Sequence, residues 1–548
     1  MTSAVSSPQR AQAVTRAMVR AVAGRSGAVI AMTQEPRRPV RAGSQDSGPV
    51  PRSHPANYAL VSWRVAVGLF ALGVITRIPF ATDHLYAPDS VLYARAMERF
   101  DPLEHRPQPP GYLWYVLLLR AVGFITQDPN RAMTIVSALA GAAAITLVYL
   151  LATRLYDERT GRVAALFMLT AATFWAYGGL AYPYTLLAAL TTITALAFWL
   201  ATSSDGPTRT RWLLGASALW GIAIGFRSDL AIFIAPVWLV AALRSRLTTV
   251  VASAAIVVAL TGVWLFASAA ADGGLARFVE ALREQGRFVD ERYSVLGIGP
   301  VAIYRNAYEL ARFLGRGLYF LIPLVAVTVL SVEARRVELR DRWRTAFIVT
   351  WTFAPLPIYV LVHVGDYGYI FSMLPGMTIL AARGAIALAK GLRMPRTFKW
   401  IVAAVALGNA AIFLISNTPI SARDIAREDQ GIGEKTRFLE ANLAPDRTVV
   451  VTAYDAVLLE QYLPKPYVAL AYDPSATPNF SRPLACASTQ ATCAGPDVAV
   501  VLWDDLLRAE GGGWQEQRMP HGGRLRMTRA TRGDSLRVTD GLGVAIAR

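Results

Sequence analysis

Residues 250–271 read VVASAAIVVALTGVWLFASAAA, a run without a charged side chain. About 20 consecutive apolar residues in a helix cross the core of a bilayer, so this run predicts a membrane-spanning helix. Further apolar runs lie at Val163–Thr173, Leu186–Ala201, Ala231–Leu243 and Ile401–Ile415. Of all 548 residues, 54% are hydrophobic and 17% are charged. The sequence therefore indicates an α-helical, polytopic membrane protein.

The positive charges are arranged as topology signals. The net charge is +17, and the Arg and Lys residues cluster in short segments between the apolar runs, as is typical of connectors held on the cytoplasmic side. This placement favours a membrane protein over a nucleic-acid-binding one. Residues 1–57 are basic and rich in Ser, Pro, Ala and Gly, so we expect a disordered cytoplasmic arm there.

Threading the chain with this arm inside places every short basic connector on one side. The first long outside loop is expected at Ala81–Asn130 and the second at Ala269–Arg312. About eleven transmembrane helices are predicted within residues 58–416: Tyr58–Phe80, Arg131–Leu151, Val163–Tyr177, Pro183–Ala201, Trp212–Phe226, Asp229–Leu243, Thr248–Ser268, Phe313–Val332, Thr345–His363, a tenth that ends at Lys390, and Trp400–Ser416.

The tail at residues 417–548 is polar and predicts a small extracytoplasmic α/β domain. Val450–Tyr462 and Asp497–Leu507 each combine a β-like run with a helical stretch, the pattern of a β-α unit. The two cysteines of the chain, Cys486 and Cys493, lie in this tail. An extracytoplasmic disulfide and two free thiols are both compatible with their spacing.

The first outside loop carries an unusual share of reactive residue types. Residues 81–100 read ATDHLYAPDSVLYARAMERF, and DPLEHRPQPPGY follows. Pro88 is placed to start a helix over Asp89–Phe100, with Asp89 in its first turn. The apolar stretch Tyr112–Ile125 is short and interrupted by Arg120, so we expect it at the membrane interface.

These motifs resemble a known family. The segment DSVLYARA from Asp89, the PPGY that ends at Tyr112, the stretch Arg131–Arg162, GIAIGFRSD at 221–229 and HVGDYGYIFSMLPG at 363–376 are similar in order and side to the GT-C glycosyltransferases. The nearest branch is that of protein O-mannosyltransferases and aminoarabinose transferases. Two departures stand out: family members commonly have an acidic pair at Asp89, and many have His where this chain has Gln108.

The resemblance implies a membrane glycosyltransferase that moves a sugar from a polyprenyl-phosphate donor to an acceptor hydroxyl on the extracytoplasmic face. Such transfer needs a base for the hydroxyl proton, which a carboxylate in a partly desolvated cleft can supply. Asp89 is the candidate base and Asp83 its rival. The leaving phosphate needs a fixed positive charge, for which Arg227 is the candidate.

Other residues are candidate substrate-binding groups. They are Asp229, His105, Tyr93, His363, Asp366 and Tyr367. Asp229 has an alternative role as the helix-start partner of Arg227, and His363, Asp366 and Tyr367 have one as turn residues. No tight ligand spacing indicates a metal site, so we expect no cofactor; a divalent metal held by His84, His105 and Asp89 is the open alternative, which the spacing does not support. Tyr177, Tyr182 and Tyr184 are expected to form an interfacial aromatic belt, and Glu280–Arg292 a solvated helix face.

The expected partners are a polyprenyl-phosphate sugar, membrane lipid, and an envelope glycan, lipid or protein acceptor. The expected location is a bacterial inner membrane. Two alternative functions are a transporter or flippase of lipid-linked sugar and a non-catalytic scaffold with an outside binding domain. Transporters often carry polar residues or broken helices near mid-membrane in repeated halves, whereas here the charges lie at helix ends.

Overall fold

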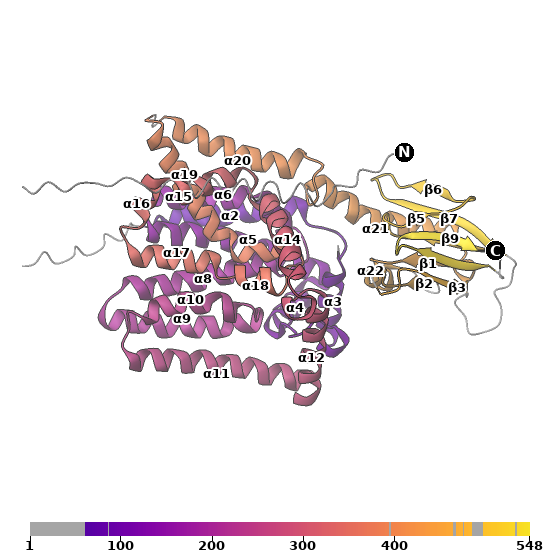
Figure 1. Cartoon of the computed structure of the whole chain (residues 1–548), viewed down its shortest axis with the longest axis horizontal. Coiled ribbons are helices and arrows are strands. Elements are labelled where there is room, and N and C mark those ends of the chain that lie inside the picture. The colour runs from indigo at the N-terminus through magenta and orange to yellow at the C-terminus, as the bar shows by residue number, and fades with distance from the viewer. Residues whose placement is uncertain are drawn as a thin grey trace, which may run out of the picture. The chain divides into compact units, whose positions relative to one another are not determined.

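The structure, a computed structural model, describes residues 61–547 except 86, 394–395, 464–466, 475, 485–496 and 532–533 (Figure 1). The described residues belong to one structural unit that runs from Tyr58 to Arg548. The expected arm at residues 1–57 and the pair Cys486 and Cys493 lie outside the described residues.

Helices occupy all eleven positions expected for membrane helices, and α8, α9, α10 and α11 among them lie side by side in Figure 1. In chain order they are α2 (Trp63–Ile75) with η1 (Ile78–Phe80), α5 (Pro129–Leu155), α6 (Glu158–Thr170) with α7 (Ala172–Tyr177), α8 (Tyr184–Ser203), α9 (Gly206–Phe226), α10 (Leu230–Ala242), α11 (Leu247–Ala271), α14 (Val301–Leu318) with η3 (Tyr319–Leu321) and α15 (Ile322–Leu330), α17 (Arg342–Phe353) with α18 (Leu356–Leu361), α19 (Leu374–Gly391) and α20 (Thr397–Ile415).

Within the described part of the chain, seven helical segments are long and apolar enough to cross a membrane. They are Trp63–Phe80, Pro129–Leu155, Tyr184–Ser203, Leu247–Ala271, Val301–Leu330, Arg342–Leu361 and Thr397–Ile415. The polytopic helical fold is therefore confirmed, while the number of eleven spans stays a prediction. The helix expected from Phe313 begins earlier, at Val301, so the second outside connection is shorter than expected.

Small residues let the central helices approach closely. Helix α5 packs against α2, α6 and α8, and Ala142 and Ala144 on α5 are fully buried. A Cβ atom at Gly73 of α2 would lie 2.8 Å from the Ala142 backbone. Without a hydrophobic driving force between helices in lipid, such close packing is a main source of their association.

The connectors predicted to be cytoplasmic meet one another. Beyond the end of α5, the Tyr156 hydroxyl donates to Glu338 of α16 (Val332–Glu338), and Arg383 of α19 donates to the same carboxylate, each over 2.8 Å. Arg244, after α10, donates to the Thr202 carbonyl near the end of α8 over 2.6 Å. These contacts agree with the predicted alternation of the chain.

Helices also form in both outside segments. The first contains α3 (Pro88–Glu98), close to its predicted bounds, η2 (Pro102–Glu104) and α4 (Leu113–Thr126); the second contains α12 (Leu275–Arg292) and α13 (Val295–Ile298), and η4 (Tyr367–Ser372) precedes α19. Arg120, which interrupts the apolar face of α4, donates to the carbonyls of Ala96 and Met97. It thereby satisfies backbone acceptors that the end of α3 leaves open.

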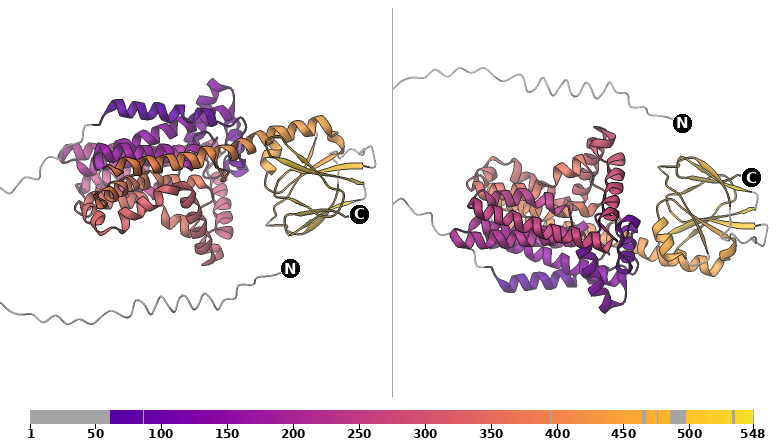
Figure 2. Two further views of the ribbon diagram at one scale, coloured as in Figure 1. Left: turned by 90° about the horizontal axis from the view of Figure 1, so that it is seen from above. Right: turned by 90° about the horizontal axis from the view of Figure 1, so that it is seen from below.

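The C-terminal domain packs two sheets together and covers one of them with helices α21 (Ala422–Asn442) and α22 (Ala456–Tyr462) (Figure 2). The first sheet has the order β2-β1-β4-β7-β6, and the second β3-β8-β9-β5. The strands are β1 (Thr448–Thr452), β2 (Val468–Ala471), β3 (Phe480–Pro483), β4 (Asp497–Leu502), β5 (Arg508–Ala509), β6 (Gln515–Arg518), β7 (Arg524–Thr531), β8 (Ser535–Thr539) and β9 (Gly543–Ala547), and a short turn, η5 (Pro445–Arg447), precedes β1.

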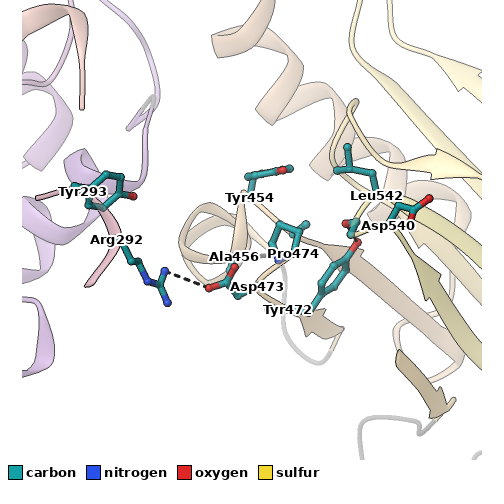
Figure 3. Close-up of a pocket in the computed structure, with 12 residues that line it drawn as sticks. Arg292, Tyr293, Tyr454, Ala456, Tyr472, Asp473, Pro474, Asp540 and Leu542 are labelled. Atoms are coloured by element: carbon teal, nitrogen blue, oxygen red, sulfur yellow. Dashed lines mark hydrogen bonds and ion pairs between the residues drawn. The ribbon is translucent and has the colours of Figure 1, made fainter. Parts of the chain in front are cut away.

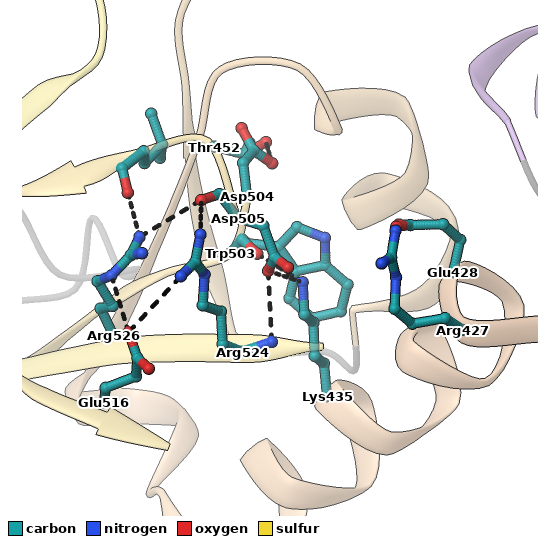
Figure 4. Close-up of polar contacts among 11 residues, drawn as sticks. Arg427, Glu428, Lys435, Thr452, Trp503, Asp504, Asp505, Glu516, Arg524 and Arg526 are labelled. Atoms are coloured by element: carbon teal, nitrogen blue, oxygen red, sulfur yellow. Dashed lines mark hydrogen bonds and ion pairs between the residues drawn. The ribbon is translucent and has the colours of Figure 1, made fainter. Parts of the chain in front are cut away.

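Alternation along β1 explains this layering. Val449 and Val451 pack with residues of the second sheet, whereas Val450 packs with Leu439 of α21 and Leu459 of α22. Successive side chains of a strand point to opposite faces, so an all-apolar strand requires cover on both. Lys435 fixes α21 to the sheet by donating to the Trp503 carbonyl over 2.9 Å (Figure 4).

One of the two predicted β-α units is correct. Strand β1 is followed by α22, as expected, with β1 parallel to β2 and β4. The second prediction, Asp497–Leu507, is wrong in its second half: β4 is followed by a turn that leads into β5. Asp504 explains the difference, because its carboxylate accepts hydrogen bonds from Thr452 and Ala453 at the end of β1 instead of starting a helix.

We predict that Asp101→Asn destabilises the outside segments. The buried Asp101 carboxylate binds the guanidinium groups of Arg99 and Arg277, and both hydrogen bonds are weakened when the carboxylate loses its charge. Burial raises the pKa of Asp101, but Arg277 and the Glu104 backbone N–H outweigh it and lower that pKa overall. The stabilisation is therefore present at neutral pH and is lost as the pH falls through the lowered pKa.

The measurement is the Tm of the purified protein from pH 7 down to pH 3. The variant should melt below wild type at pH 7, and the difference should shrink as the pH falls. Glu104→Gln, an exposed carboxylate of the same turn, is the matched control. Equal Tm values for Asp101→Asn and wild type at pH 7 would contradict a stabilising role for the ion pairs of Asp101.

Candidate functional site

A cavity of about 580 Å³ lies among the outside segments. Its walls come from the start of α3, the turn around η2, the connection between α7 and α8, α12, and the segment before η4. Most of the lining residues are polar or aromatic. The complete lining consists of Pro88, Asp89, Pro102, Leu103, His105, Gln108, Pro109, Tyr112, Tyr182, Tyr184, Ala281, Glu284, Gln285, Phe288, Val289, Tyr293, His363, Gly365, Asp366 and Tyr369. The cavity thus brings together the predicted residues Asp89, His105, His363 and Asp366.

Asp89 reaches the cavity because Pro88 starts α3 and leaves Asp89 in the first turn. Its Oδ1 accepts a hydrogen bond from the side-chain amide of Gln108 over 2.6 Å. Burial raises the pKa of Asp89 above its usual value, although the Gln108 hydrogen bond and the charge of Arg227 each oppose the rise. A carboxylate with a raised pKa is a stronger base near neutral pH.

The two departures from the family pattern have structural explanations. Gln108 takes the place of the usual His and supplies the hydrogen bond to Asp89. Ser90 is fully buried, and its hydroxyl donates to the Ala181 carbonyl over 2.9 Å. A second carboxylate at this position would lose contact with water, and burying an unpaired charge is costly.

Arg227 lies behind the cavity wall, directly after α9. Its side chain is 5% exposed and forms an ion pair with Asp229 over 2.8 Å. The guanidinium carbon lies 5.6, 5.1 and 5.9 Å from the ring centroids of Tyr112, Tyr184 and Tyr369. Aromatic rings stabilise a cation at such distances, and these three rings line the cavity. Arg227 and Asp229 are thus one layer removed from the cavity.

His363 and Asp366 enter the cavity from the segment before η4. Burial raises the pKa of Asp366 to about 6, even though its carboxylate accepts hydrogen bonds from the Tyr177 hydroxyl and the Gly368 N–H. Burial, assisted by the charge of Arg305, lowers the pKa of His363 to about 4. At neutral pH the His363 imidazole is therefore uncharged.

Besides Arg227 and Asp229, three predicted site residues do not line the cavity. Asp83 is exposed, and its backbone N–H donates to Asp429 of α21 over 3.0 Å. Tyr93 is buried beneath the cavity, with its ring centroid 5.8 Å from that of Tyr112. Tyr367 turns away, and its hydroxyl accepts a hydrogen bond from Arg316.

Several lining residues were not predicted for the site. Tyr182 and Tyr184, expected in an interfacial belt, line the cavity, and the Tyr177 hydroxyl binds Asp366. Glu284 and Tyr293 come from the segment expected to be a solvated helix face. The sequence does hold three tyrosines within the eight residues Tyr177–Tyr184, next to Gly178–Gly179. This clustering is the feature from which a place in the site could have been predicted.

An apolar groove of about 450 Å³ opens between α4, α9 and α11. It is lined by Trp114, Leu117, Leu118, Ile222, Phe226, Leu260 and Val263. A Cβ atom at Gly225 would lie 2.0 Å from the Trp114 indole nitrogen, so only glycine permits this packing. Two of its lining residues are close in sequence to the site: Phe226 directly precedes Arg227, and Trp114 follows two residues after Tyr112, whose ring lies near the guanidinium.

Within the described part of the chain, no group of three or more His, Cys, Asp or Glu side chains is placed to hold a metal ion. The expectation of no metal cofactor stays a prediction.

Comparison with known proteins identifies the class. Residues 107–268 match the family model described as dolichyl-phosphate-mannose-protein mannosyltransferase. The matched segment includes Gln108, Tyr112 and Arg227. No curated protein sequence matches the chain.

Solved structures share the fold. ArnT from Cupriavidus metallidurans in the apo state is 15% identical, with 85% of this chain and 97% of that one covered at a TM-score of 0.52. The same protein bound to undecaprenyl phosphate gives 15% identity, the same coverages and a TM-score of 0.49. The oligosaccharyltransferase of Archaeoglobus fulgidus, in complex with zinc and sulfate, gives 15% identity, coverages of 75% and 62%, and a TM-score of 0.43.

The fold shared with apo ArnT and the matched family segment confirm the predicted resemblance to GT-C glycosyltransferases. The chain is a multi-pass membrane protein and a glycosyltransferase, with a fold similar to that of ArnT and a segment similar to the matched mannosyltransferase family.

We predict that Gln108→Leu raises the pKa of Asp89, because it removes the hydrogen bond that stabilises the charged carboxylate. If the charged form is needed for transfer, the acidic limb of the pH–rate profile should move to higher pH. The measurement is kcat/KM for sugar transfer between pH 5 and pH 9. Gln285→Leu, a second glutamine of the cavity wall, is the matched control, and an unmoved limb in Gln108→Leu would contradict the role of this hydrogen bond.

Proposed function

We propose that this enzyme transfers a sugar from a polyprenyl-phosphate donor to an acceptor hydroxyl on the extracytoplasmic face, with Asp89 as the general base. The observation that carries the proposal is the combination of three features: a carboxylate with a raised pKa in a cavity, a buried guanidinium behind the wall, and an apolar groove whose residues Phe226 and Trp114 lie one residue from Arg227 and two residues from Tyr112 in the chain.

In the proposed reaction the acceptor oxygen attacks the anomeric carbon of the donor sugar. The bond between that carbon and the phosphate oxygen breaks, and polyprenyl phosphate leaves with the electron pair. Asp89 takes the proton of the acceptor hydroxyl, which increases the nucleophilicity of the oxygen as the new bond forms. The Gln108 amide orients the carboxylate for this step.

The donor is proposed to bind across the junction of groove and cavity. Its polyprenyl chain lies in the groove along Trp114 and Ile222, and its sugar lies in the cavity near Asp89. The phosphate lies near Arg227, whose fixed charge favours the negative charge that develops on the leaving group. Asp229 holds the guanidinium in place. The rings of Tyr112, Tyr184 and Tyr369 separate the guanidinium from the cavity, so Arg227 is proposed to act on the phosphate through its charge.

His105, His363 and Asp366 are proposed to bind the sugars, since they share the cavity with Asp89. The uncharged His363 imidazole can donate and accept hydrogen bonds with hydroxyl groups. Tyr93 is proposed to support Tyr112 from beneath, and Tyr367 has no proposed contact with substrate.

The orientation follows the distribution of charge. Basic connectors such as Arg335–Arg344 are proposed to face the cytoplasm, which places the cavity and the residue 417–548 domain on the extracytoplasmic face. Residues 58–416 then form the transmembrane catalytic domain. A bacterial inner membrane is the proposed location.

We predict that Asp89→Asn lowers the rate of transfer by about 100- to 10,000-fold, the usual contribution of a general base. The measurement is transfer of labelled sugar from a polyprenyl-phosphate donor pool in membranes with equal amounts of inserted protein. Asp83→Asn, an exposed carboxylate of the same loop, is the matched control and should retain activity. Normal transfer by Asp89→Asn would remove Asp89 as the base, and no transfer by wild type would favour a transporter or a scaffold.

We also predict that Ile222→Trp, which fills the groove, weakens use of the long-chain donor. KM for that donor should rise about tenfold, equivalent to the loss of roughly 1.4 kcal/mol of apolar contact. A short-chain donor analogue should be affected little, because its tail does not extend along the groove. Ile232→Trp, an exposed position on α10, is the matched control. Equal effects on long and short donors would place the lipid chain elsewhere.

A further inference from the structure

A second cavity, of about 800 Å³, lies next to the first. One wall is the end of α12, with Arg292 and Tyr293, and the facing wall belongs to the C-terminal domain, with Tyr454, Tyr472 and Asp540 (Figure 3). Arg292 forms an ion pair with Asp473 across the cavity, over 3.4 Å. The proposed reaction assigns no substrate contact to these residues.

The domain side of this cavity is a usual place for a ligand. Its residues follow the carboxyl ends of β1 and β2, two parallel neighbours in the first sheet, and ligands of open α/β sheets bind outside such ends. The tip of the β8–β9 hairpin completes the wall. Asp540 and Gly541 at this tip have φ angles of 50° and 70°, as in the Asp-Gly turns that favour tight hairpins.

The lining is rigid. The backbone N–H groups of Ala453 and Tyr454 both donate to the Asp504 carboxylate, over 2.6 and 2.9 Å. The Tyr472 hydroxyl donates to the Gly541 carbonyl over 3.0 Å, which joins the strand end to the hairpin tip. A wall fixed in this way loses little conformational freedom when a ligand binds.

The chemistry of the wall suits a neutral, hydroxyl-rich ligand. The Tyr454 side chain is 50% exposed, and the negative face of an aromatic ring attracts the C–H groups of a sugar face. Asp540 is exposed, and no partner for its carboxylate is found among the described residues, so it can accept hydrogen bonds from hydroxyl groups. Arg292 is paired with Asp473, which leaves the cavity with a net negative charge that disfavours phosphate or uronate groups.

Tyr293 connects the two cavities. It lines both of them, and its ring centroid lies 4.4 Å from that of His363 in the first cavity. Asn306 holds this segment by donating to the Tyr293 carbonyl over 3.0 Å. A chain-like ligand bound against Tyr454 can therefore pass Tyr293 and present its end to Asp89.

We propose that the second cavity binds the acceptor, and that the acceptor portion bound there is a neutral glycan. Its sugar faces stack on Tyr454 and Tyr472, its hydroxyl groups donate to Asp540, and its terminal hydroxyl extends past Tyr293 into the first cavity. The inference rests on the proposed function, and it gives the C-terminal domain the role of acceptor recognition.

Saturation-transfer NMR on the full-length protein in nanodiscs tests the inference. The probes are a pool of neutral mannan, glucan and galactan oligosaccharides, oligogalacturonates of equal length as the acidic counterpart, and a Ser/Thr-rich peptide. Wild type should bind the neutral pool in preference to the other two probes. Tyr454→Ala and Asp540→Asn should each weaken that binding about tenfold, the effect of losing one stacked ring or one strong hydrogen bond.

Tyr308→Ala and Asp446→Asn remove an exposed tyrosine and an exposed aspartate outside the cavity, and they should leave binding unchanged. Binding of the polyprenyl-phosphate donor, measured in the same nanodiscs, should be equal in all variants. Preference for the acidic oligosaccharide or the peptide, no binding of the neutral pool, or indifference to Tyr454→Ala would overturn the inference. Failure of the wild type to bind the donor at all would instead refute the proposed function, so the two failures are distinguishable.

Discussion

The burial of one guanidinium group, that of Arg227, is the constraint on which the site depends. A charge removed from water is costly unless it is paired and surrounded by favourable dipoles, and Arg227 obtains both from Asp229 and from the rings of Tyr112, Tyr184 and Tyr369. The three rings come from segments far apart in the chain. Because they must converge on one point, the outside segments that carry them converge as well, and the polar cavity is the space left on the far side of the rings.

This convergence also separates the environments that the proposed chemistry needs. The apolar groove lies along α4, α9 and α11, while Asp89 and its hydrogen-bond donor Gln108 face the polar cavity. A lipid chain prefers an apolar environment and a sugar prefers a polar one. A donor that joins the two through a phosphate therefore suits a site that combines an apolar groove, the Arg227 charge and a polar cavity. The ion pairs of Asp101 hold α12 over the same cavity, so both outside segments contribute walls.

The positions of the membrane helices could be predicted because each apolar run signals its own environment, independent of its neighbours. The start of α3 at Pro88 could be predicted for the same local reason. Contacts between distant segments could not: the pairing of Asp89 with Gln108 and the departure of Tyr367 toward Arg316 depend on packing that no local pattern encodes. The tail was under-predicted because four of the nine strands in its described part, β2, β3, β5 and β6, are edge strands of only two to four residues, and because the turn at Asp504 resembled a helix start.

The central claim is that the lipid chain of the donor binds in the apolar groove between α4, α9 and α11, and photo-crosslinking tests it most directly. A polyprenyl phosphate with a diazirine in its first isoprene units, irradiated with the purified protein in nanodiscs, would be mapped by peptide mass spectrometry. The account predicts labels on Trp114–Leu118 and Ile222–Phe226. Labels concentrated in another pocket, such as the one lined by Val327 and Ile386, with none on α4 or α9, would contradict it.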